Sequence, residues 1–211
     1  MFFPPLYIIL DTQFASTSFE SLLETFARAG ARWVQLREKK ASSKTFFESA
    51  QTFVSLCRRH DLTAIINDRV DIAMLVDADG VHLGQDDLPV EEARKLLGPD
   101  KILGLSTHNL KQALEAQQSS ADYVAIGPVY PTTSKQNPDP IVSWEELKVV
   151  RRKVNKPLVA IGGITAENAR PLFQLGIDSV AVIRDVLLAT DVENRVRQYL
   201  ANANGGLRDA E

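Results

Sequence analysis

The sequence predicts a single (β/α)₈ barrel of parallel strands, a fold in the α/β class. Short strand-like runs alternate eight times with longer segments of helical periodicity, at a mean repeat of about 25 residues. The strand-like runs are almost continuously apolar, as expected for a parallel sheet covered on both faces. A doubly wound open sheet is the competing architecture.

The first half of the chain supplies four of the expected strand–helix units. In residues 18–29 apolar side chains recur at intervals of three and four, the spacing of one helix face, and Gly30 follows as a stop. Residues 43–60 repeat this pattern and place Cys57 on the apolar face, so we expect this thiol in the core. The expected strands are 6–10, 33–37, 63–66 and 80–83, and the expected helices are 18–29, 43–60, 69–76 and 90–97.

The second half of the chain repeats the alternation four more times. The expected strands are 102–105, 123–126, 158–161 and 179–183, and the expected helices are 109–118, 144–154, 166–175 and 186–200. Neither a linker nor a shift in composition divides the 211 residues. We therefore expect one catalytic domain over residues 1–202 and a polar, flexible tail over 203–211.

Composition and charge exclude several classes of protein. Apolar residues make up 45% of the chain, which is enough to build a core and excludes a disordered polypeptide. The 24 basic and 27 acidic side chains give a formal net charge of −3, which argues against partners such as nucleic acid or an anionic membrane. The first basic residue is Arg28, and Pro4 and Pro5 interrupt the apolar N-terminus, so we expect no secretory signal. We expect a cytoplasmic protein, and its single cysteine fits a reducing compartment.

Polar side chains follow the predicted strands from the second to the eighth. In a (β/α)₈ barrel the carboxyl ends of the strands and the loops after them carry the chemistry. In strand order these positions hold Gln35, Arg37 and Lys39; Asn67 and Asp68; Gln85, Asp86 and Asp87; Ser106, Thr107 and His108; Thr132, Thr133, Ser134 and Lys135; Gly162 and Gly163; and Ile183 and Arg184. We therefore expect a site that is rich in charge at one end of the barrel.

This set of residue types favours a phosphorylated ligand and a divalent cation. Arg37, Lys39 and Lys135 are suited to bind phosphate oxygens, the arginine as a fork and the lysines as point charges. Asp68 and Asp87 would repel the same phosphate unless a cation lies between them. Mg²⁺ takes one or two carboxylates together with substrate phosphates. A diphosphate bridged by Mg²⁺ is the simplest ligand that needs both signs of charge.

Each of these signals also fits an ordinary structural role. A charged turn accounts for residues 37–40, a helix cap for residues 67–68 and a plain loop for residues 84–87. The pair Gly162-Gly163 either cradles a second phosphate or permits close packing. The three histidines, His60, His82 and His108, show no metal-ligand spacing, and we expect them to be structural or exposed. The position of all the signals at successive strand ends is what favours a site.

Six motifs together resemble those of the thiamine phosphate synthase family. They are Gln35-Leu36-Arg37-Glu38-Lys39, Asn67-Asp68, and residues 84–87, 104–106, 127–135 and 161–164, in the family's order. The resemblance implies a Mg²⁺-dependent transferase of thiamine biosynthesis. Such an enzyme joins 4-amino-2-methyl-5-hydroxymethylpyrimidine diphosphate to 4-methyl-5-(2-hydroxyethyl)thiazole phosphate and releases diphosphate. The implied substitution is dissociative and passes through a carbocation-like pyrimidine.

The resemblance also implies roles for individual residues. It assigns the pyrimidine diphosphate to Gln35, Leu36, Arg37, Glu38, Lys39, Asn67, Ser106 and Lys135, among which Arg37, Lys39, Ser106 and Lys135 form the catalytic set. It assigns Mg²⁺ to Asp68 and Asp87, and the thiazole phosphate to Thr132, Thr133, Ser134, Gly163, Ile183 and Arg184.

Two positions depart from the family pattern. Ser134 stands where the family usually has threonine, and it keeps the hydroxyl. Arg184 stands where many members have serine, so a guanidinium replaces a hydroxyl at the expected thiazole phosphate site. Residues 130–140 contain three prolines and Lys135, and we expect them to form a flap that closes over the diphosphate.

The sequence leaves other functions open. A thiazole tautomerase resembles this family but moves a proton without a diphosphate. A non-catalytic barrel that binds phosphorylated ligands, or a phosphate-binding barrel of another pathway, would keep part of the charged set. A homo-oligomer is likewise left open.

Overall fold

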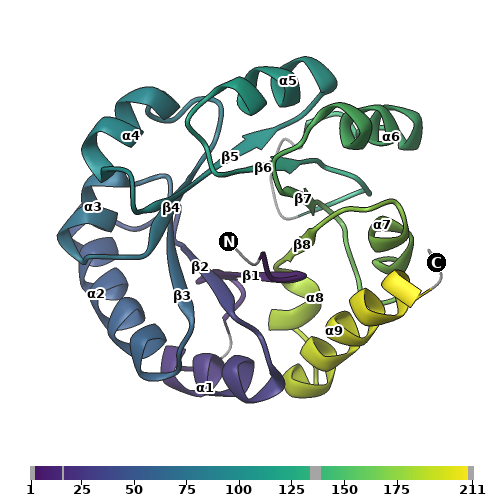
Figure 1. Ribbon diagram of the computed structural model, residues 1–211. Coiled ribbons are helices and arrows are strands. Elements are labelled where there is room, and N and C mark those ends of the chain that lie inside the picture. Colours follow the sequence, from purple (N-terminus) through teal and green to yellow (C-terminus); the bar gives the residue numbers. More distant parts are fainter. Residues whose placement is uncertain (1–2, 16, 134–138, 209–211) are drawn as a thin grey trace.

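Eight parallel strands close into a barrel in the computed structural model, which describes residues 3–15, 17–133 and 139–208. Each strand pairs with the next one in sequence, and β8 pairs back with β1 (Figure 1). The strands are β1 (Leu6–Asp11), β2 (Trp33–Arg37), β3 (Thr63–Asn67), β4 (Gly80–Leu83), β5 (Ile102–Thr107), β6 (Tyr123–Ile126), β7 (Leu158–Ile161) and β8 (Ser179–Val182). The predicted (β/α)₈ barrel is confirmed, and the open-sheet alternative is wrong.

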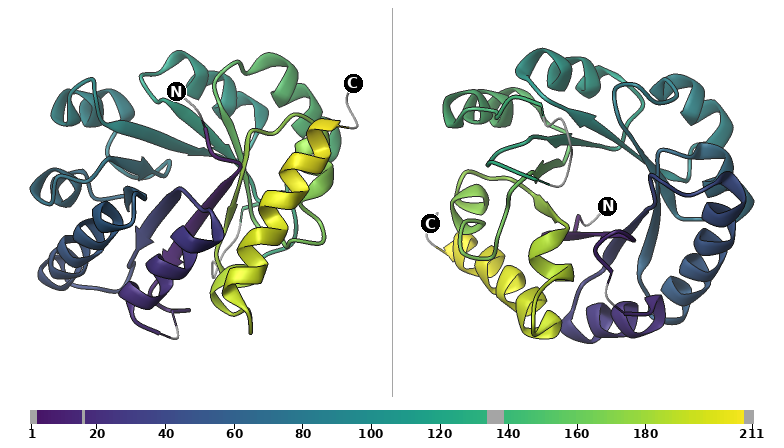
Figure 2. Two further views of the ribbon diagram at one scale, coloured as in Figure 1. Left: turned by 60° about the horizontal axis from the view of Figure 1, so that its bottom comes forward. Right: turned by 180° about the vertical axis from the view of Figure 1, so that it is seen from behind.

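The helices form a ring around the barrel, as the views from both ends show (Figures 1 and 2). They are α1 (Phe19–Ala29), α2 (Ser43–Arg59), α3 (Val70–Leu75), α4 (Val90–Leu97), α5 (Leu110–Gln118), α6 (Trp144–Lys153), α7 (Arg170–Gln174), α8 (Arg184–Leu187) and α9 (Val192–Arg208). Among the described residues, no helix is long and apolar enough to cross a membrane.

The strands bury both of their faces. Side chains alternate along a strand, so Tyr7 and Ile9 point into the barrel whereas Ile8 and Leu10 face the helices. The inner cluster is small and rich in aromatic side chains, and the outer cluster extends around the whole ring. Cys57 lies in the outer cluster with no exposed surface, as the sequence predicts.

Polar side chains set the starts of several helices. Ser18, Ser42, Asn109 and Ser143 each accept a hydrogen bond from the backbone N–H three residues later. These contacts satisfy N–H groups that have no partner within the helix. Gly30 ends α1 with a φ of 101°, so the predicted stop is confirmed by a left-handed conformation that suits glycine.

The last two predicted helices differ most from the structure. The predicted single helix over 186–200 is wrong, because α8 ends at Leu187 and α9 begins only at Val192. The side chain of Asp191 caps the start of α9 by accepting the N–H of Asn194. Helix α7 starts only at Arg170, since the side chain of Asn168 holds residues 165–168 in a turn by accepting the N–H of Thr165. Helix α9 continues to Arg208, past the expected domain boundary at residue 202.

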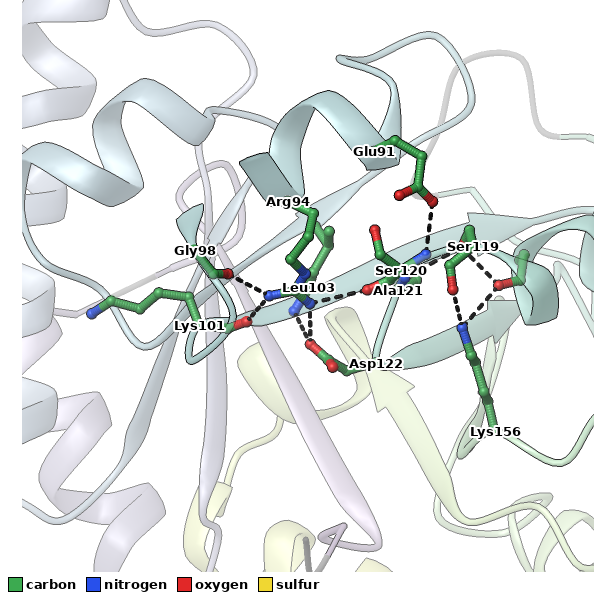
Figure 3. Close-up of polar contacts among 11 residues, drawn as sticks. Glu91, Arg94, Gly98, Lys101, Leu103, Ser119, Ser120, Ala121, Asp122 and Lys156 are labelled. Atoms are coloured by element: carbon green, nitrogen blue, oxygen red, sulfur yellow. Dashed lines mark hydrogen bonds and ion pairs between the residues drawn. The ribbon is translucent and has the colours of Figure 1, made fainter. Parts of the chain in front are cut away.

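At the amino ends of the strands a polar contact recurs. An aspartate just before an even-numbered strand accepts the N–H of the preceding odd-numbered strand, in the pairs Asp79–Ala64, Asp122–Leu103 and Asp178–Leu158. Figure 3 shows that Arg94 of α4 adds donors to one of these aspartates and to nearby carbonyl oxygens. Arg151 of α6 does the same beside Asp178. This end of the barrel is therefore held by internal polar pairing.

Candidate active site

A cavity of about 880 Å³ opens at the carboxyl ends of the strands. Nearly all of the described residues that the sequence singles out line it: Gln35, Arg37, Lys39, Asn67, Asp68, Asp87, Ser106, Thr132, Thr133, Gly163, Ile183 and Arg184. The closed barrel thus brings together side chains that lie up to about 150 positions apart in the sequence.

Four of the predicted site residues are not placed in the cavity. Leu36 is fully buried among the helices, because alternation along β2 turns it away from Gln35 and Arg37. Glu38 does not contribute to the cavity wall either. Ser134 and Lys135 lie outside the described residues, as does the middle of the expected flap at 134–138.

Arg37 is held by a carboxylate that the sequence analysis missed. Asp11 ends β1 with no exposed surface, and its side chain forms an ion pair and hydrogen bond with the Arg37 guanidinium. Its other oxygen accepts the N–H of Gln13 at 3.0 Å. The pairing follows from the register, which sets Asp11 directly beside Arg37 on neighbouring strands. A buried carboxylate that fixes an arginine in this way leaves the remaining guanidinium N–H groups for an anion.

Asp68 and Asp87 form an acidic pair in the wall of the cavity. Asp68 adopts a left-handed conformation with a φ of 62°, which turns the chain at the end of β3 and is rare for residues other than glycine. Its carboxylate pairs with Lys39, which is half exposed. Asp87 accepts the N–H of Gly84 at 2.7 Å. Burial and the neighbouring Asp68 carboxylate raise the pKa of Asp87.

These two carboxylates fit a magnesium ion that is shared with a substrate. Adjacent carboxylates repel each other, and a divalent cation between them removes that repulsion. The described residues contain no cluster of three or more His, Cys, Asp or Glu side chains suited to a metal. Mg²⁺ is commonly bound by only one or two carboxylates, with phosphate oxygens and water completing its coordination. The donor set therefore matches this ion.

Gly162 and Gly163 allow two loops to approach each other closely. Gly163 has a φ of 64°, and a Cβ placed on it would lie 2.2 Å from the carbonyl oxygen of Pro131. A Cβ on Gly162 would lie 2.5 Å from a side-chain carbon of Pro128. Close packing, one of the two interpretations of this pair, is confirmed. Both glycines also line the cavity, so the phosphate role stays a prediction.

Arg184 connects three loops at the rim of the cavity. It opens α8, donates a hydrogen bond to the hydroxyl of Thr133, and lies over the ring of Phe14 at 5.3 Å from the ring centroid. Phe14 follows β1, and Thr133 belongs to the loop after β6. The position that departs from the family pattern thus carries a cation with fixed contacts on two sides.

Two histidines belong to the cavity rather than to the surface. His82 and His108 both line it, and His108 Nδ1 lies 2.7 Å from the carbonyl oxygen of Gly127. His82 lies on β4 at a position that faces the barrel interior, which alternation along this strand could have indicated. His60, by contrast, follows the end of α2 on the outside of the barrel.

Comparisons with known proteins agree with this geometry. The family model for thiamine monophosphate synthase matches residues 6–186. The chain belongs to the thiamine monophosphate synthase family. The thiamine-phosphate synthase of Shouchella clausii is 41% identical over 197 residues, which cover 93% of this chain and 94% of that protein. The thiamine-phosphate synthase of Chloroflexus aurantiacus is 43% identical over 197 residues, covering 93% and 91%.

A solved structure supports the membership of the thiamine monophosphate synthase family. The thiamine phosphate pyrophosphorylase of Pyrococcus furiosus superposes with a TM-score of 0.85 at 36% identity, and the match covers 96% of each chain. The resemblance inferred from the six sequence motifs is confirmed.

Proposed function

We propose that this chain is a Mg²⁺-dependent thiamine phosphate synthase. It joins the pyrimidine diphosphate to the thiazole phosphate and releases diphosphate. The observation that carries this assignment is the cavity at the carboxyl ends of the strands, in which Arg37 and Lys39 lie beside the paired carboxylates of Asp68 and Asp87. Family membership supports the same activity.

Two groups of residues in the cavity wall suit the two substrates. Gln35 and Arg37 of β2, Asn67 of β3 and Ser106 of β5 line one part of the cavity and suit a pyrimidine with its diphosphate. Thr132, Thr133, Gly163, Ile183 and Arg184 lie at the ends of β6, β7 and β8 and suit the thiazole phosphate. The ends of strands seven and eight are where barrels of this kind often hold a phosphate.

The residues of this chain stabilise charge on the leaving diphosphate and position the two substrates. Arg37, fixed by Asp11, and Lys39 stabilise the negative charge that grows on the leaving diphosphate. The walls hold the thiazole nitrogen close to the cationic carbon of the pyrimidine, so no protein nucleophile is needed. Asp68 and Asp87 would hold Mg²⁺, which would supply further neutralisation of the diphosphate charge. Lys135 and Ser134 complete the proposed set.

The alternatives explain less of the cavity. Proton transfer by a thiazole tautomerase gives no reason for Arg37 and Lys39 to lie beside two carboxylates. A barrel that only binds phosphorylated ligands gives no reason for two adjacent carboxylates where the pKa of Asp87 is raised. We propose small phosphorylated molecules as the partners and the cytoplasm as the location.

A coupling assay tests the proposed function. Wild-type protein mixed with both substrates and Mg²⁺ forms thiamine phosphate, and chelation of the metal abolishes the product. Asp87→Asn lowers kcat by roughly 100-fold or more, because one oxygen donor and one charge are lost, and changes the unfolding temperature little. Asp86→Asn, next to it in the same loop, is the matched control and keeps most of the activity. Absence of product at every Mg²⁺ concentration contradicts the assignment.

A further inference from the structure

The turn after β1 contacts two arginines that line different parts of the cavity. Asp11 begins this turn, and its carboxylate pairs with the guanidinium of Arg37. Phe14 ends the turn, and the guanidinium carbon of Arg184 lies over its ring at 5.3 Å from the ring centroid. Because β1 pairs with both β2 and β8, this one turn reaches side chains at the ends of both neighbouring strands.

Hydrogen bonds fix the shape of the turn. The N–H of Phe14 donates to the carbonyl oxygen of Asp11 at 2.9 Å, and the N–H of Gln13 donates to Asp11 Oδ1 at 3.0 Å. The N–H of Thr12 donates to the carbonyl oxygen of Arg37 at 3.2 Å, which ties the turn to β2. An aspartate that bonds the backbone two residues later stabilises such a turn. Asp11 has no exposed surface, so water competes little for these contacts.

Phe14 supports Arg184 from behind the cavity wall. Arg184 lines the cavity, whereas the half-buried ring of Phe14 packs against the outer hydrophobic cluster. A cation over an aromatic face is attracted by the electrons of the ring. The guanidinium also donates a hydrogen bond to the hydroxyl of Thr133. Both of these partners are uncharged, so they order the guanidinium without neutralising it.

The carboxylate of Asp185, next to Arg184 in the sequence, is engaged elsewhere. Its Oδ2 accepts the N–H of Ala166 at 3.1 Å and the hydroxyl of Tyr199 at 2.7 Å, and it lies 3.5 Å from Arg195. A carboxylate paired with Arg184 would compete with an incoming phosphate for the same N–H groups. An aromatic ring holds the guanidinium without that competition.

We propose that Phe14 is a positioning residue that holds the Arg184 guanidinium for the phosphate group of the thiazole substrate, and that Asp11 sets this contact by shaping the turn. The inference rests on the proposed function, which assigns the thiazole phosphate to Arg184. Asp11 then serves both substrates, since one of its oxygens orders Arg37 and the other orders the turn that carries Phe14. The ring acts through Arg184 and does not need to touch the ligand.

Steady-state kinetics of Phe14→Leu test the role of the ring. The variant keeps an apolar side chain but removes the aromatic face, so the KM for thiazole phosphate rises about fourfold. The kcat and the KM for the pyrimidine diphosphate stay within about twofold of wild type. Phe14→Tyr is the matched control, because it keeps the aromatic face and therefore a KM within about twofold of wild type. A wild-type KM in Phe14→Leu overturns the inference, and so does an equal rise in Phe14→Tyr.

A double-mutant cycle tests whether Phe14 acts through Arg184. In the Arg184→Ser background the ring has no cation to hold, so adding Phe14→Leu changes the KM for thiazole phosphate by less than about twofold. A further fourfold rise in the double variant overturns the inference, because the ring would then act independently of Arg184. Calorimetric titration of thiazole phosphate into the four proteins of the cycle measures the same coupling without turnover.

Variants of the turn test the role of Asp11. In Asp11→Asn one oxygen replaces two, so the side chain cannot accept from both Gln13 and Arg37. The KM rises about tenfold for the pyrimidine diphosphate and about threefold for thiazole phosphate. Gln13→Pro removes the N–H that Asp11 accepts and leaves Arg37 paired, so only the KM for thiazole phosphate rises, by about threefold. Gln13→Ala, the matched control, keeps this N–H and the wild-type KM values.

The KM for thiazole phosphate decides this second part of the test. A wild-type value in Asp11→Asn or in Gln13→Pro overturns the role of the turn, and so does an equal rise in Gln13→Ala. If Asp11→Asn does not fold, the two variants of Gln13 decide the question. A wild type that fails to couple the two substrates contradicts the proposed function, whereas an active wild type whose variants keep their KM values contradicts only this inference.

Discussion

Arg184 shows how a single substitution can be accommodated within a family site. Its guanidinium contacts Thr133 and Phe14, so it is held in place before any ligand binds. Side chains that are already ordered lose less conformational entropy when they bind a phosphate. Where relatives are expected to carry a serine hydroxyl, this chain therefore offers a fixed charge.

Arg184→Ser tests the contribution of that charge. We expect the KM for thiazole phosphate to rise about tenfold, because a charge-assisted contact to the phosphate is lost, while the KM for the pyrimidine diphosphate does not change. Arg184→Lys keeps the charge without the planar fork and gives an intermediate KM. Steady-state kinetics with each substrate varied in turn measure both values. Equal KM values in wild type and Arg184→Ser would show that the backbone alone binds the phosphate.

At the same scale the sequence predicts some site residues and misses others for a definite reason. Arg37, Lys39 and Asp87 are detectable because charged side chains at the end of an apolar run stand out from the pattern of the strand. Asp11 is missed because one carboxylate at a strand end resembles an ordinary turn, and its role depends on the register with Arg37. Phe14 is missed because an aromatic residue next to a strand is expected to be core, and only the closed barrel brings its ring to Arg184.

At the scale of elements, the amino end of the barrel is built for stability. Arg94 donates to the carbonyl oxygens of Gly98, Lys101 and Ser120 and to the carboxylate of Asp122, so one side chain of α4 ties together the segments before β5 and β6 (Figure 3). Its side chain is only 17% exposed, which limits the competition from water.

Arg94→Met removes these contacts while keeping the aliphatic part of the side chain. We expect a loss of about 2–4 kcal/mol in the free energy of unfolding, because several buried carbonyl oxygens and a carboxylate lose their donor. Lys95→Met, one position along α4, removes only an exposed pair with Glu92 and costs less than about 0.5 kcal/mol. Chemical denaturation measures both. A cost for Arg94→Met as small as that of the control would contradict this role.

The predictable part of the elements is their number and order rather than their ends. Eight strands follow from the repeat of apolar runs, whereas the break between α8 and α9 depends on Asp191, which is one polar residue among several in a helical pattern. Local periodicity does not reveal which polar residue caps a helix, since the choice is decided by packing against neighbouring elements.

At the scale of the whole molecule, a net charge of −3 does not show that charges of both signs gather in one cavity. The cations Arg37, Lys39 and Arg184 lie at the carboxyl end of the barrel beside carboxylates that include Asp68 and Asp87. We expect the KM of both phosphorylated substrates to rise severalfold between about 0.05 and 0.5 M NaCl at constant Mg²⁺, because salt screens the attraction. Initial rates across the salt series test this. KM values that are insensitive to salt would contradict a site that attracts its ligands by charge.

The pairing of β1 with β8 has a consequence for synthesis of the chain. Leu6, the first residue of the first strand, lies opposite Val180, so the ring closes only when the chain through β8 has left the ribosome. Until then β1 and the latest strand present unpaired backbone edges to solvent, and such edges associate readily with other chains. Slow translation of the codons for β8 and for the residues just after it would lengthen that exposure and favour aggregation of the nascent protein.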